Sequence, residues 1–212
     1  MDILNHLSES VTLGQQDRVR ELVEEAIALE IASPQILTRG LIPGMDVVGQ
    51  KFQAGEYYIP NMLLAARAMQ GALEILRPRL AETGAKPVGK VVLGTVHGDH
   101  HDIGKNLVRM MLEGKGFEVI DLGINTPPAR FVEATDETVD IIGLSCLLST
   151  TAPFIGDTIE ALEKAGVRDR VKIMIGGGVV SQKLADDCGA DAYGRDAAVG
   201  AVKALELLGV DP

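Results

Sequence analysis

The sequence predicts an all-helical N-terminal part followed by an α/β part with a doubly wound parallel sheet. Two observations support this division. Residues 1 to about 85 show helical periodicity without a strand pattern, whereas short aliphatic runs alternate with amphipathic segments from Lys90 onward. The chain has 212 residues, which is enough for two small domains. We therefore expect a helical domain over residues 1–86 and an α/β domain over residues 87–212.

The N-terminal part is expected to form a four-helix bundle. Ser33-Pro34 predicts a helix start, with serine as N-cap and proline in the first turn. This helix should extend toward Gln50, with a break near Pro43-Gly44, and Pro60 should open a last helix that continues to Leu80. An earlier amphipathic helix is indicated by apolar residues at i, i+3, i+4, i+7 and i+8, namely Val19, Leu22, Val23, Ala26 and Ile27.

Residues 81–89 are predicted to link the two parts. The segment is small, polar and interrupted by glycine and proline, which disfavour both helix and strand. We expect it to act as a hinge.

From Lys90 onward, predicted strands alternate with predicted helices. The strands are aliphatic runs without polar alternation, as in a sheet buried on both faces. The repeated βα order predicts parallel strands in a Rossmann- or flavodoxin-like sheet. The expected strands are Lys90–Leu93, Phe117–Asp121, Ile141–Leu144, Val171–Ile175 and a weaker one at Asp191–Tyr193. The expected helices are Ile103–Gly114, Pro128–Thr138, Phe154–Ala165, Ser181–Cys188 and Ala197–Leu208.

Composition excludes several classes of function. The net charge of −10 opposes binding to nucleic acid or to anionic membranes. The sequence has no apolar run of the roughly 18 residues that a membrane span needs, and the polar segment Met1–Glu9 does not resemble a signal peptide. Cys146 and Cys188 lack CxxC spacing, which favours reduced thiols in a cytoplasmic protein.

The loop after the first strand concentrates ionisable side chains. Three of the four histidines lie there, at His97, His100 and His101, together with Asp99 and Asp102. In an open α/β sheet, ligands bind at the carboxyl ends of the strands. Metal binding is therefore the first hypothesis for this loop.

Two further strand ends carry unusual residues. A run of hydroxyl and aliphatic residues, 145–151, follows the third strand, and three glycines, 176–178, follow the fourth. Glycines at such an edge allow a bulky ligand to approach the main chain closely. The three strand ends should share one edge of the sheet.

These motifs together resemble the signature of cobalamin-binding domains of the base-off, His-on type. The matching residues are Asp99-x-His101-x-x-Gly104, Ser145-x-Leu147 and Gly176-Gly177, in the order of that family. Segments 44–52 and 55–60 resemble the helical cap of methionine synthase and of the small corrinoid proteins that serve methyltransferase systems. The two-domain organisation is most similar to the free-standing corrinoid proteins, and the chain is identified as a member of that group.

The resemblance implies roles for three residues around the metal. His101 would be the lower axial ligand of cobalt. Asp99 would accept a hydrogen bond from the other ring nitrogen, which fixes the tautomer and raises the basicity of the ligand. Thr151 would add a hydroxyl to this chain of hydrogen bonds, here called the relay, which runs from His101 through Asp99.

The resemblance also implies a set of cofactor-binding positions. Gly104 would give clearance beneath the corrin, while Phe52 and Ile59 would cover its upper, methyl-bearing face. Ile59 stands where the methionine synthase cap usually has leucine. The remaining expected contacts, mostly with the corrin edge and the displaced nucleotide tail, are His100, Asp102, Ile103, Ser145, Leu147, Ser149, Thr150, Gly176, Gly177, Gly178, Tyr193, Gly194 and Asp196.

The function implied by the resemblance is that of a corrinoid methyl carrier, which is one component of a methyltransferase system and not a complete catalyst alone. A substrate-specific methyltransferase would place a methyl group on cobalt(I). A second methyltransferase would pass it to a thiol such as coenzyme M or to tetrahydrofolate. A reductive activase would restore cobalt(I) after oxidation. Neither nucleic acid nor a membrane is an expected partner.

Several alternatives stay open from the residues alone. His97, Asp99 and His101 could form a zinc or iron site if the loop were extended. Periodicity alone favours Phe52 and Ile59 as core residues of a helical bundle, and only the resemblance places them at the cofactor. Among related functions, a cobalamin-dependent sensor or regulator is disfavoured because no basic helix-turn-helix segment precedes residue 17. A mutase small subunit would share the Asp-x-His-x-x-Gly loop but usually lacks the helical cap.

Overall fold

The computed structural model describes residues 2–82 and 86–211. The chain divides into two compact units. One comprises the residues up to Val88 together with Glu113–Gly116, and the other comprises Gly89–Leu112 and the residues from Phe117 onward. Residues 83–85 of the expected linker lie outside the described residues.

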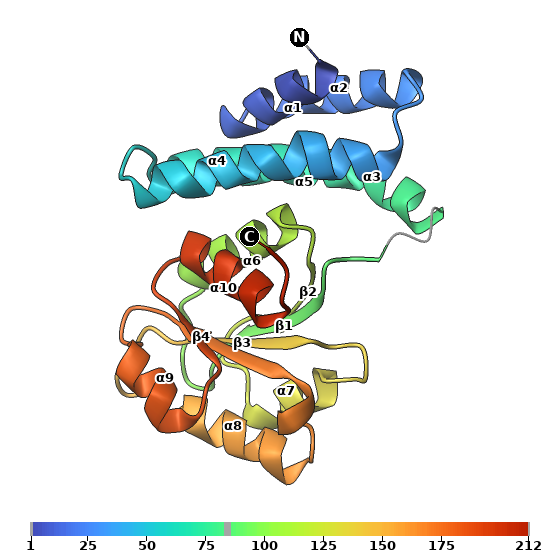
Figure 1. Cartoon of the computed structure of the whole chain (residues 1–212). Helices are drawn as coiled ribbons and strands as arrows, with labels where there is room; N and C mark the ends of the chain where they lie inside the picture. The colour runs from blue at the N-terminus through green and yellow to red at the C-terminus, as the bar shows by residue number, and fades with distance from the viewer. Residues whose placement is uncertain (1, 83–85, 212) are drawn as a thin grey trace. The chain divides into compact units, whose positions relative to one another are not determined.

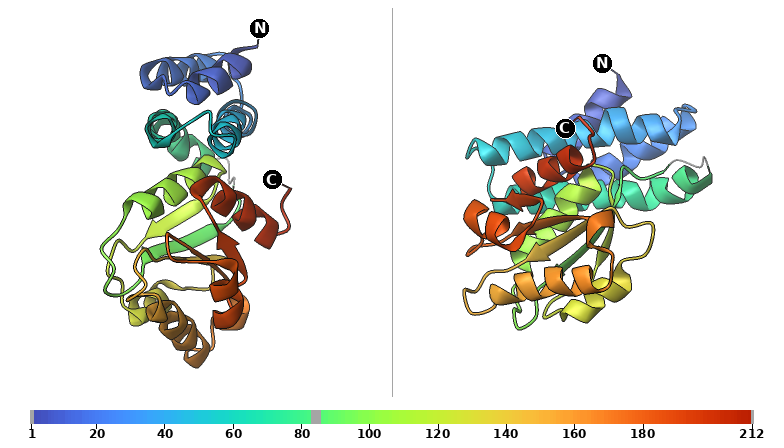
Figure 2. Two further views of the ribbon diagram at one scale, coloured as in Figure 1. Left: turned by 90° about the vertical axis from the view of Figure 1, so that its left-hand side faces the viewer. Right: turned by 60° about the horizontal axis from the view of Figure 1, so that its bottom comes forward.

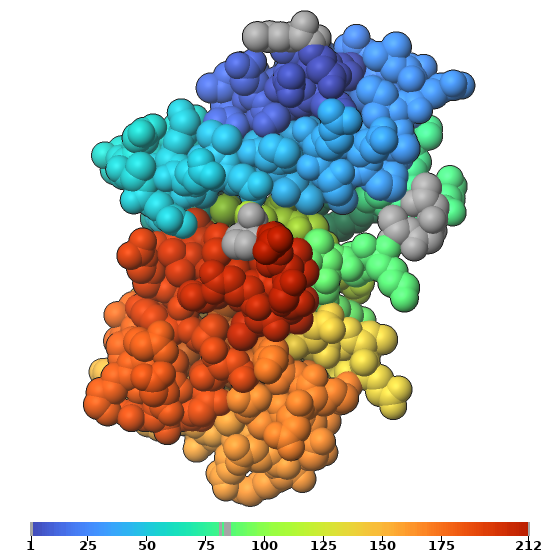
Figure 3. Space-filling view, in the orientation of Figure 1, coloured from blue at the N-terminus to red at the C-terminus, as the bar shows by residue number. Residues whose placement is uncertain are grey.

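The N-terminal unit is helical, as expected. α1 and α2 form one layer against α4 and α5, and the space-filling view shows side chains filling the space between α1 and α4 (Figures 1 and 3). Gly44 allows the close approach of α4 to α1, because a Cβ there would lie 2.7 Å from the Ser8 carbonyl oxygen. The helices are α1 (Ile3–Thr12), α2 (Gln16–Ala28), α3 (Ser33–Gln35), the π-helical turn η1 (Ile36–Leu41), α4 (Ile42–Gln53) and α5 (Ile59–Glu82).

The irregularity expected near Pro43-Gly44 lies earlier than the sequence predicts. The backbone stays helical through Pro43, and the π-helical turn η1 precedes it. The Ile42 N–H donates to the Leu37 carbonyl, five residues back, and this wider turn relieves the crowding that a proline ring imposes on the preceding turn. The expected N-cap was also wrong by one residue, because Ala32 is the N-cap and Ser33 is the first helical residue.

The C-terminal unit is a five-stranded sheet with the order β2-β1-β3-β4-β5, in which every pairing is parallel. This is the flavodoxin-like order, and the predicted fold class is confirmed. The strands are β1 (Lys90–Thr95), β2 (Glu118–Asp121), β3 (Ile141–Ser145), β4 (Lys172–Gly176) and β5 (Ala192–Gly194). The helices are α6 (Ile103–Gly114), α7 (Pro128–Ala134), α8 (Pro153–Lys164), the 3₁₀ turn η2 (Arg168–Arg170), α9 (Gln182–Cys188) and α10 (Ala197–Leu207).

One helix of the C-terminal unit is shorter than expected. The sequence predicts a helix to Thr138, whereas α7 ends at Ala134. The Asp136 carboxylate accepts hydrogen bonds from the main-chain N–H and the hydroxyl of Thr138. Such a local side-chain bond competes with helical hydrogen bonding and ends the helix.

Helices cover both faces of the sheet. α7, α8 and α9 pack on one face, where Phe131, Ile155 and Ile159 join the buried strand residues in one apolar cluster. α6 and α10 lie side by side on the other face (Figures 1 and 2). The strand order reverses between β1 and β3, so the loops after these two strands diverge to opposite faces and leave a crevice at their carboxyl ends. None of the helices in residues 2–82 and 86–211 combines the length and apolar character needed to cross a bilayer.

Candidate functional site

The predicted site lies at the point where the strand order reverses. Residues 96–102, here called the His loop, connect β1 to α6. Residues 146–152, here called the hydroxyl loop, connect β3 to α8. Because β1 and β3 pair directly, with Thr95 opposite Ser145, the two loops leave the sheet next to each other.

Asp99 holds the two loops together. Its carboxylate is fully buried and accepts five hydrogen bonds. Oδ1 accepts from the main-chain N–H of His101 at 3.0 Å and lies 2.7 Å from Nδ1 of its ring. Oδ2 accepts from the N–H groups of Leu147 at 2.7 Å and Leu148 at 3.2 Å, and from the Thr151 hydroxyl at 3.2 Å. The two oxygens thus serve different loops.

The surroundings of Asp99 keep it ionised. Burial by itself raises its pKa. Hydrogen bonds from the Leu147 N–H, the His101 ring and the main chain of His101 and Leu148 outweigh that effect and place the pKa well below its ordinary value. An ionised carboxylate only accepts hydrogen bonds, so Nδ1 of His101 carries the proton. The lone pair of the neutral imidazole is then at Nε2.

The His101 side chain is exposed while its main chain is fixed. Half of the side chain (51%) is accessible, although its partner Asp99 is fully buried. The buried Thr95 hydroxyl donates to the His101 carbonyl at 2.9 Å. The loop therefore presents one basic nitrogen at the surface in a fixed orientation.

Asn125, in the loop after β2, holds the His loop from the other side. Its side-chain oxygen accepts from the Gly98 N–H at 2.7 Å, and its own N–H donates to the Asp99 carbonyl at 2.8 Å. Asn125 adopts a φ of +50°, in the left-handed region that side chains other than asparagine and aspartate rarely enter. Asn125 was not among the expected site residues, although an asparagine directly before Thr126-Pro127 is a turn signal.

The other histidines of the loop do not join His101 in a metal site. The His97 ring packs edge-on against Phe154, with ring centroids 4.9 Å apart, and His100 is exposed. Across the described parts of the chain, no three His, Cys, Asp or Glu side chains are grouped so that they could hold a metal ion. The alternative of a zinc or iron site made by His97, Asp99 and His101 therefore has no support in the geometry.

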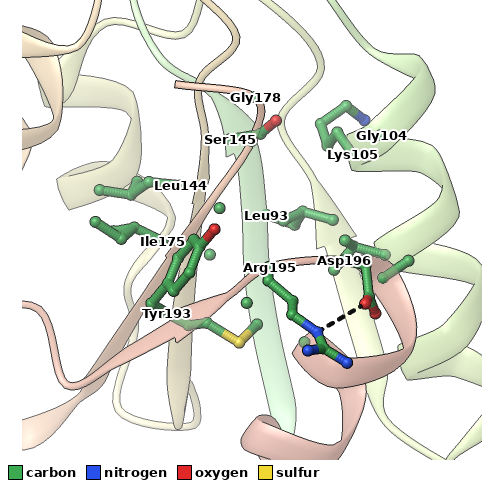
Figure 4. Close-up of a pocket in the computed structure, with 18 residues that line it drawn as sticks. Leu93, Gly104, Lys105, Leu144, Ser145, Ile175, Gly178, Tyr193, Arg195 and Asp196 are labelled. Carbon is green, nitrogen blue, oxygen red and sulfur yellow. Dashed lines mark hydrogen bonds and ion pairs between the residues drawn. The ribbon is translucent and has the colours of Figure 1, made fainter. Parts of the chain in front are cut away.

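A cavity of about 280 Å³ opens beside the two loops (Figure 4). It lies over the carboxyl halves of β1, β3, β4 and β5 and is bounded by α6 and α10. Of the predicted cofactor-binding residues, eight line it: Gly104, Ser145, Gly176, Gly177, Gly178, Tyr193, Gly194 and Asp196. The apolar strand residues Leu93, Leu144, Met174 and Ile175 also line it.

The glycines that line this cavity have two kinds of surroundings. Gly177 has a φ of +126°, and a Cβ there would overlap the Cys146 carbonyl. A Cβ at Gly176 would lie 2.9 Å from the Gly194 carbonyl oxygen, so these two glycines let neighbouring main chain pack closely. A Cβ at Gly104 would meet no atom within 4 Å, so that position leaves main chain open to a ligand.

Two charged residues also line the cavity, and Lys105 was not among the predicted site residues. Lys105 is buried, and its ammonium group donates to both oxygens of Asp121 at 2.6 Å. This links the first turn of α6 to the end of β2. Its position directly after Gly104 is the sequence signal that could have identified it. Arg195, in the segment expected at the nucleotide tail, is exposed at the rim and pairs with Asp196 at 3.3 Å (Figure 4).

The remaining predicted residues lie outside the cavity lining. The Leu147 side chain is exposed, and its main-chain N–H holds Asp99. The exposed loop residues are His100, Asp102, Ser149 and Thr150, and Ile103 is exposed at the start of α6. In the helical unit, Phe52 is half-buried near the end of α4 and Ile59 is exposed at the start of α5.

The sequence matches a known family over both units. Residues 89–204 match the B12 binding domain, and residues 3–77 match a second B12 binding domain family. The chain therefore belongs to the B12-binding corrinoid proteins, a class that the flavodoxin-like sheet and the Asp99–His101 pair had already indicated.

Individual relatives show similarity over the whole chain. The chain is 42% identical to dimethylamine corrinoid protein 2 of Methanosarcina acetivorans, over 98% of its own length and 96% of the relative. A cobalamin-binding protein from Desulfitobacterium hafniense has a similar solved structure, with a TM-score of 0.81, 33% identity and 98% of both chains covered. The methanol:cobalamin methyltransferase complex of Methanosarcina barkeri contains a chain with a TM-score of 0.86 and 27% identity, covering 99% of this chain and 81% of that one.

Proposed function

We propose that this protein is a corrinoid methyl carrier that binds its cofactor in the base-off, His-on mode, with His101 as the lower axial ligand of cobalt. The observation that carries the proposal is the Asp99–His101 pair. A buried, ionised carboxylate 2.7 Å from Nδ1 leaves Nε2 as an exposed basic nitrogen. A neutral imidazole oriented by a carboxylate is a suitable ligand for a transition metal.

The residues present fit a corrinoid. Gly104, three residues after His101, faces open space, and Gly177 and Gly178 line the cavity without side chains. We propose that the cavity of about 280 Å³ takes the nucleotide tail that base-off binding displaces from cobalt. Its apolar strand floor suits a flat base, and the exposed Arg195 at its rim could donate to a phosphate.

Different residues of the chain would have different roles in binding the cofactor. The corrinoid, when bound, would supply a cobalt centre that accepts and releases a methyl group. His101 would orient the cofactor through Nε2 and hold one proton at Nδ1. Asp99 and Thr151 would keep that proton in place and adjust the basicity of the ring. We further propose that residues 1–86 are the cap, with Phe52 and Ile59 covering the upper face of the cofactor, and that residues 87–212 bind it.

We propose partners on the basis of the relatives. One relative is named a dimethylamine corrinoid protein, and one solved structure is a methanol:cobalamin methyltransferase complex. The proposed cycle has a substrate-specific methyltransferase as donor and a second methyltransferase that delivers the methyl group to a thiol or to tetrahydrofolate. A reductive activase would serve the same carrier. The two free cysteines fit a cytoplasmic location.

Electron paramagnetic resonance tests the ligand assignment. The full chain is loaded with cob(II)alamin after growth with ¹⁵N-histidine or with unlabelled histidine. Coordination by His101 predicts nitrogen splitting that changes from a triplet to a doublet on labelling. His101→Ala should abolish the label-dependent change, whereas His100→Ala should retain it. A nitrogen splitting that is the same with labelled and unlabelled histidine would contradict the proposal.

A further inference from the structure

Cys146 has a buried thiol next to the relay of His101, Asp99 and Thr151, and the proposed function gives this thiol no role. It directly follows β3, and its side chain is fully buried. Its Sγ lies 3.4 Å from the Thr151 hydroxyl oxygen and 3.4 Å from the Leu148 carbonyl oxygen. Thr151 in turn lies 3.2 Å from Asp99 Oδ2. The thiol is therefore one hydrogen bond further from His101 than Thr151 is.

The Thr151 hydroxyl has a choice of partners. It carries one proton and lies within reach of three acceptors, which are Asp99 Oδ2 at 3.2 Å, the Leu148 carbonyl at 3.0 Å and Cys146 Sγ at 3.4 Å. Only the first arrangement adds a donor to the carboxylate that orients His101. The direction of this one hydroxyl thus decides whether Thr151 belongs to the relay.

Charge favours one arrangement. The Leu148 carbonyl already accepts the main-chain N–H groups of Thr151 and Ala152, each at 3.1 Å. Asp99 Oδ2 likewise already accepts two N–H groups, those of Leu147 and Leu148, so the Thr151 hydroxyl is a third donor at either oxygen. The carboxylate is charged and the carbonyl is not, and a hydrogen bond to a charged acceptor is the stronger one. Donation from the thiol to Thr151 leaves the Thr151 proton for this stronger acceptor.

The thiol stays protonated in this position. Burial raises the pKa of Cys146 above its ordinary value. A neutral thiol has one weak donor, and the Thr151 oxygen has lone pairs that can accept it.

We propose that Cys146 is a positioning residue that donates through its S–H to Thr151 and so directs the Thr151 hydroxyl toward Asp99. The chain of hydrogen bonds then runs from Cys146 through Thr151 and Asp99 to the proton on Nδ1 of His101. Its consequence for cobalt rests on the proposed function above, while the hydrogen bonds themselves can be tested without any cofactor.

The first test is infrared spectroscopy of the S–H stretch in the cofactor-free full-length protein. The Cys188→Ala background leaves Cys146 as the single thiol. In that background Thr151→Val removes the hydroxyl with little change of shape, and the S–H band should move. Thr151→Ser keeps a hydroxyl and should leave the band near its original position. A band that is the same in the valine variant as in the parent would overturn the proposal.

Thr151→Val could alter folding, so circular dichroism and urea unfolding accompany the spectra. If the valine variant does not fold, the comparison moves to Cys146. In the cofactor-free protein, Cys146→Ala and Cys146→Ser are compared by nuclear magnetic resonance of the Thr151 hydroxyl and methyl signals. The alanine variant should change these signals and the serine variant should restore them. Unchanged signals in the alanine variant would overturn the proposal.

The second test measures the consequence for the cofactor. With hydroxocobalamin bound, Cys146→Ala should lower the ratio of His-on to His-off cobalamin about threefold, as expected for the loss of one weak hydrogen bond. Cys146→Ser should restore the ratio, and Cys188→Ala should not change it. An unchanged ratio in Cys146→Ala would remove the positioning role. If wild-type protein shows no His-on form at all, the proposed function fails, while the infrared result on the thiol still stands.

Discussion

The two halves of the candidate site are built by opposite means. The His loop is held by hydrogen bonds, with five donors converging on the buried Asp99 carboxylate. The neighbouring cavity is lined by glycines, of which Gly104 leaves main chain open to a ligand while Gly176 and Gly177 let neighbouring main chain pack closely. One half orients a single atom, Nε2 of His101, and the other half provides room.

This difference predicts different responses to mutation. In the hydrogen-bonded half, removing one acceptor leaves several buried donors unpaired and should cost stability. In the glycine half, adding one methyl group should either disturb the fold or block the ligand, depending on what the new Cβ meets. The four substitutions below separate these effects, from the largest expected loss of stability to the smallest.

Gly177→Ala should be the most destabilising change. Its φ of +126° is strained for alanine, and the new Cβ would overlap the Cys146 carbonyl. We expect a loss of about 4 kcal/mol in the free energy of unfolding. Urea unfolding measures it, with Gly178→Ala as the control, since its Cβ would meet only the end of the exposed Leu147 side chain. Equal losses of unfolding free energy in the two variants would show that overlap with the Cys146 main chain does not cause the destabilisation.

Asp99→Asn should destabilise the hydrogen-bonded half by about 3 kcal/mol. The asparagine NH₂ group would face donors that now point at a carboxylate oxygen, such as the Leu147 N–H or the His101 ring. The control is Asp102→Asn, at an exposed residue of the same loop. Urea unfolding compares them, and a loss in Asp99→Asn no larger than in the control would contradict the central role of Asp99.

Asn125→Ala should cost about 1–2 kcal/mol, from the lost hydrogen bond to the Gly98 N–H and the strain of alanine at positive φ. Asn125→Gly loses the same hydrogen bond but tolerates the left-handed backbone, so its loss should be smaller. Hydrogen exchange at the Gly98 amide should accelerate in both variants. Slow exchange there in Asn125→Gly would show that the side chain does not hold the His loop.

Gly104→Ala should affect binding and spare the fold. Its Cβ would meet no protein atom within 4 Å, and alanine favours helix by up to about 1 kcal/mol over glycine. The added methyl group would project into space proposed for the ligand, and we expect hydroxocobalamin affinity to fall about tenfold. Gly156→Ala in α8 has equally open surroundings but lies outside the cavity. Titration should show reduced affinity for the first variant alone.

Much of the fold was predictable because its signals are local. The four main strands were expected within two residues of their observed ends, since aliphatic runs between turn residues identify buried strands. α6 was expected over its observed range, Ile103–Gly114. The errors arose where a nearby group competed with the periodic pattern, as Asp136 does at the end of α7 and as the π-helical turn does before Pro43.

The candidate site was predictable only in part. His101 and Asp99 lie two residues apart, so their pairing follows from the local loop. The spacing of the motif does not show how Leu147 is oriented. Its side chain is exposed, while its main-chain N–H donates to Asp99. Asn125 gave no sequence signal of its hydrogen bond to Gly98, because the two residues are 27 positions apart in the chain. Cys146 is only five residues from Thr151, but the sequence does not show that its thiol is buried against that hydroxyl.

The sequence by itself determined the helices and strands, the glycine positions and the Asp99–His101 pair, because these depend on neighbours within a few residues. Tertiary structure decided which atoms complete the site. The direct pairing of β1 with β3 brings Leu147 and Thr151 to a carboxylate about 50 residues earlier in the chain, as their separations of 48 and 52 residues show. Contacts across such separations depend on strand order, which is set by the packing of the whole sheet.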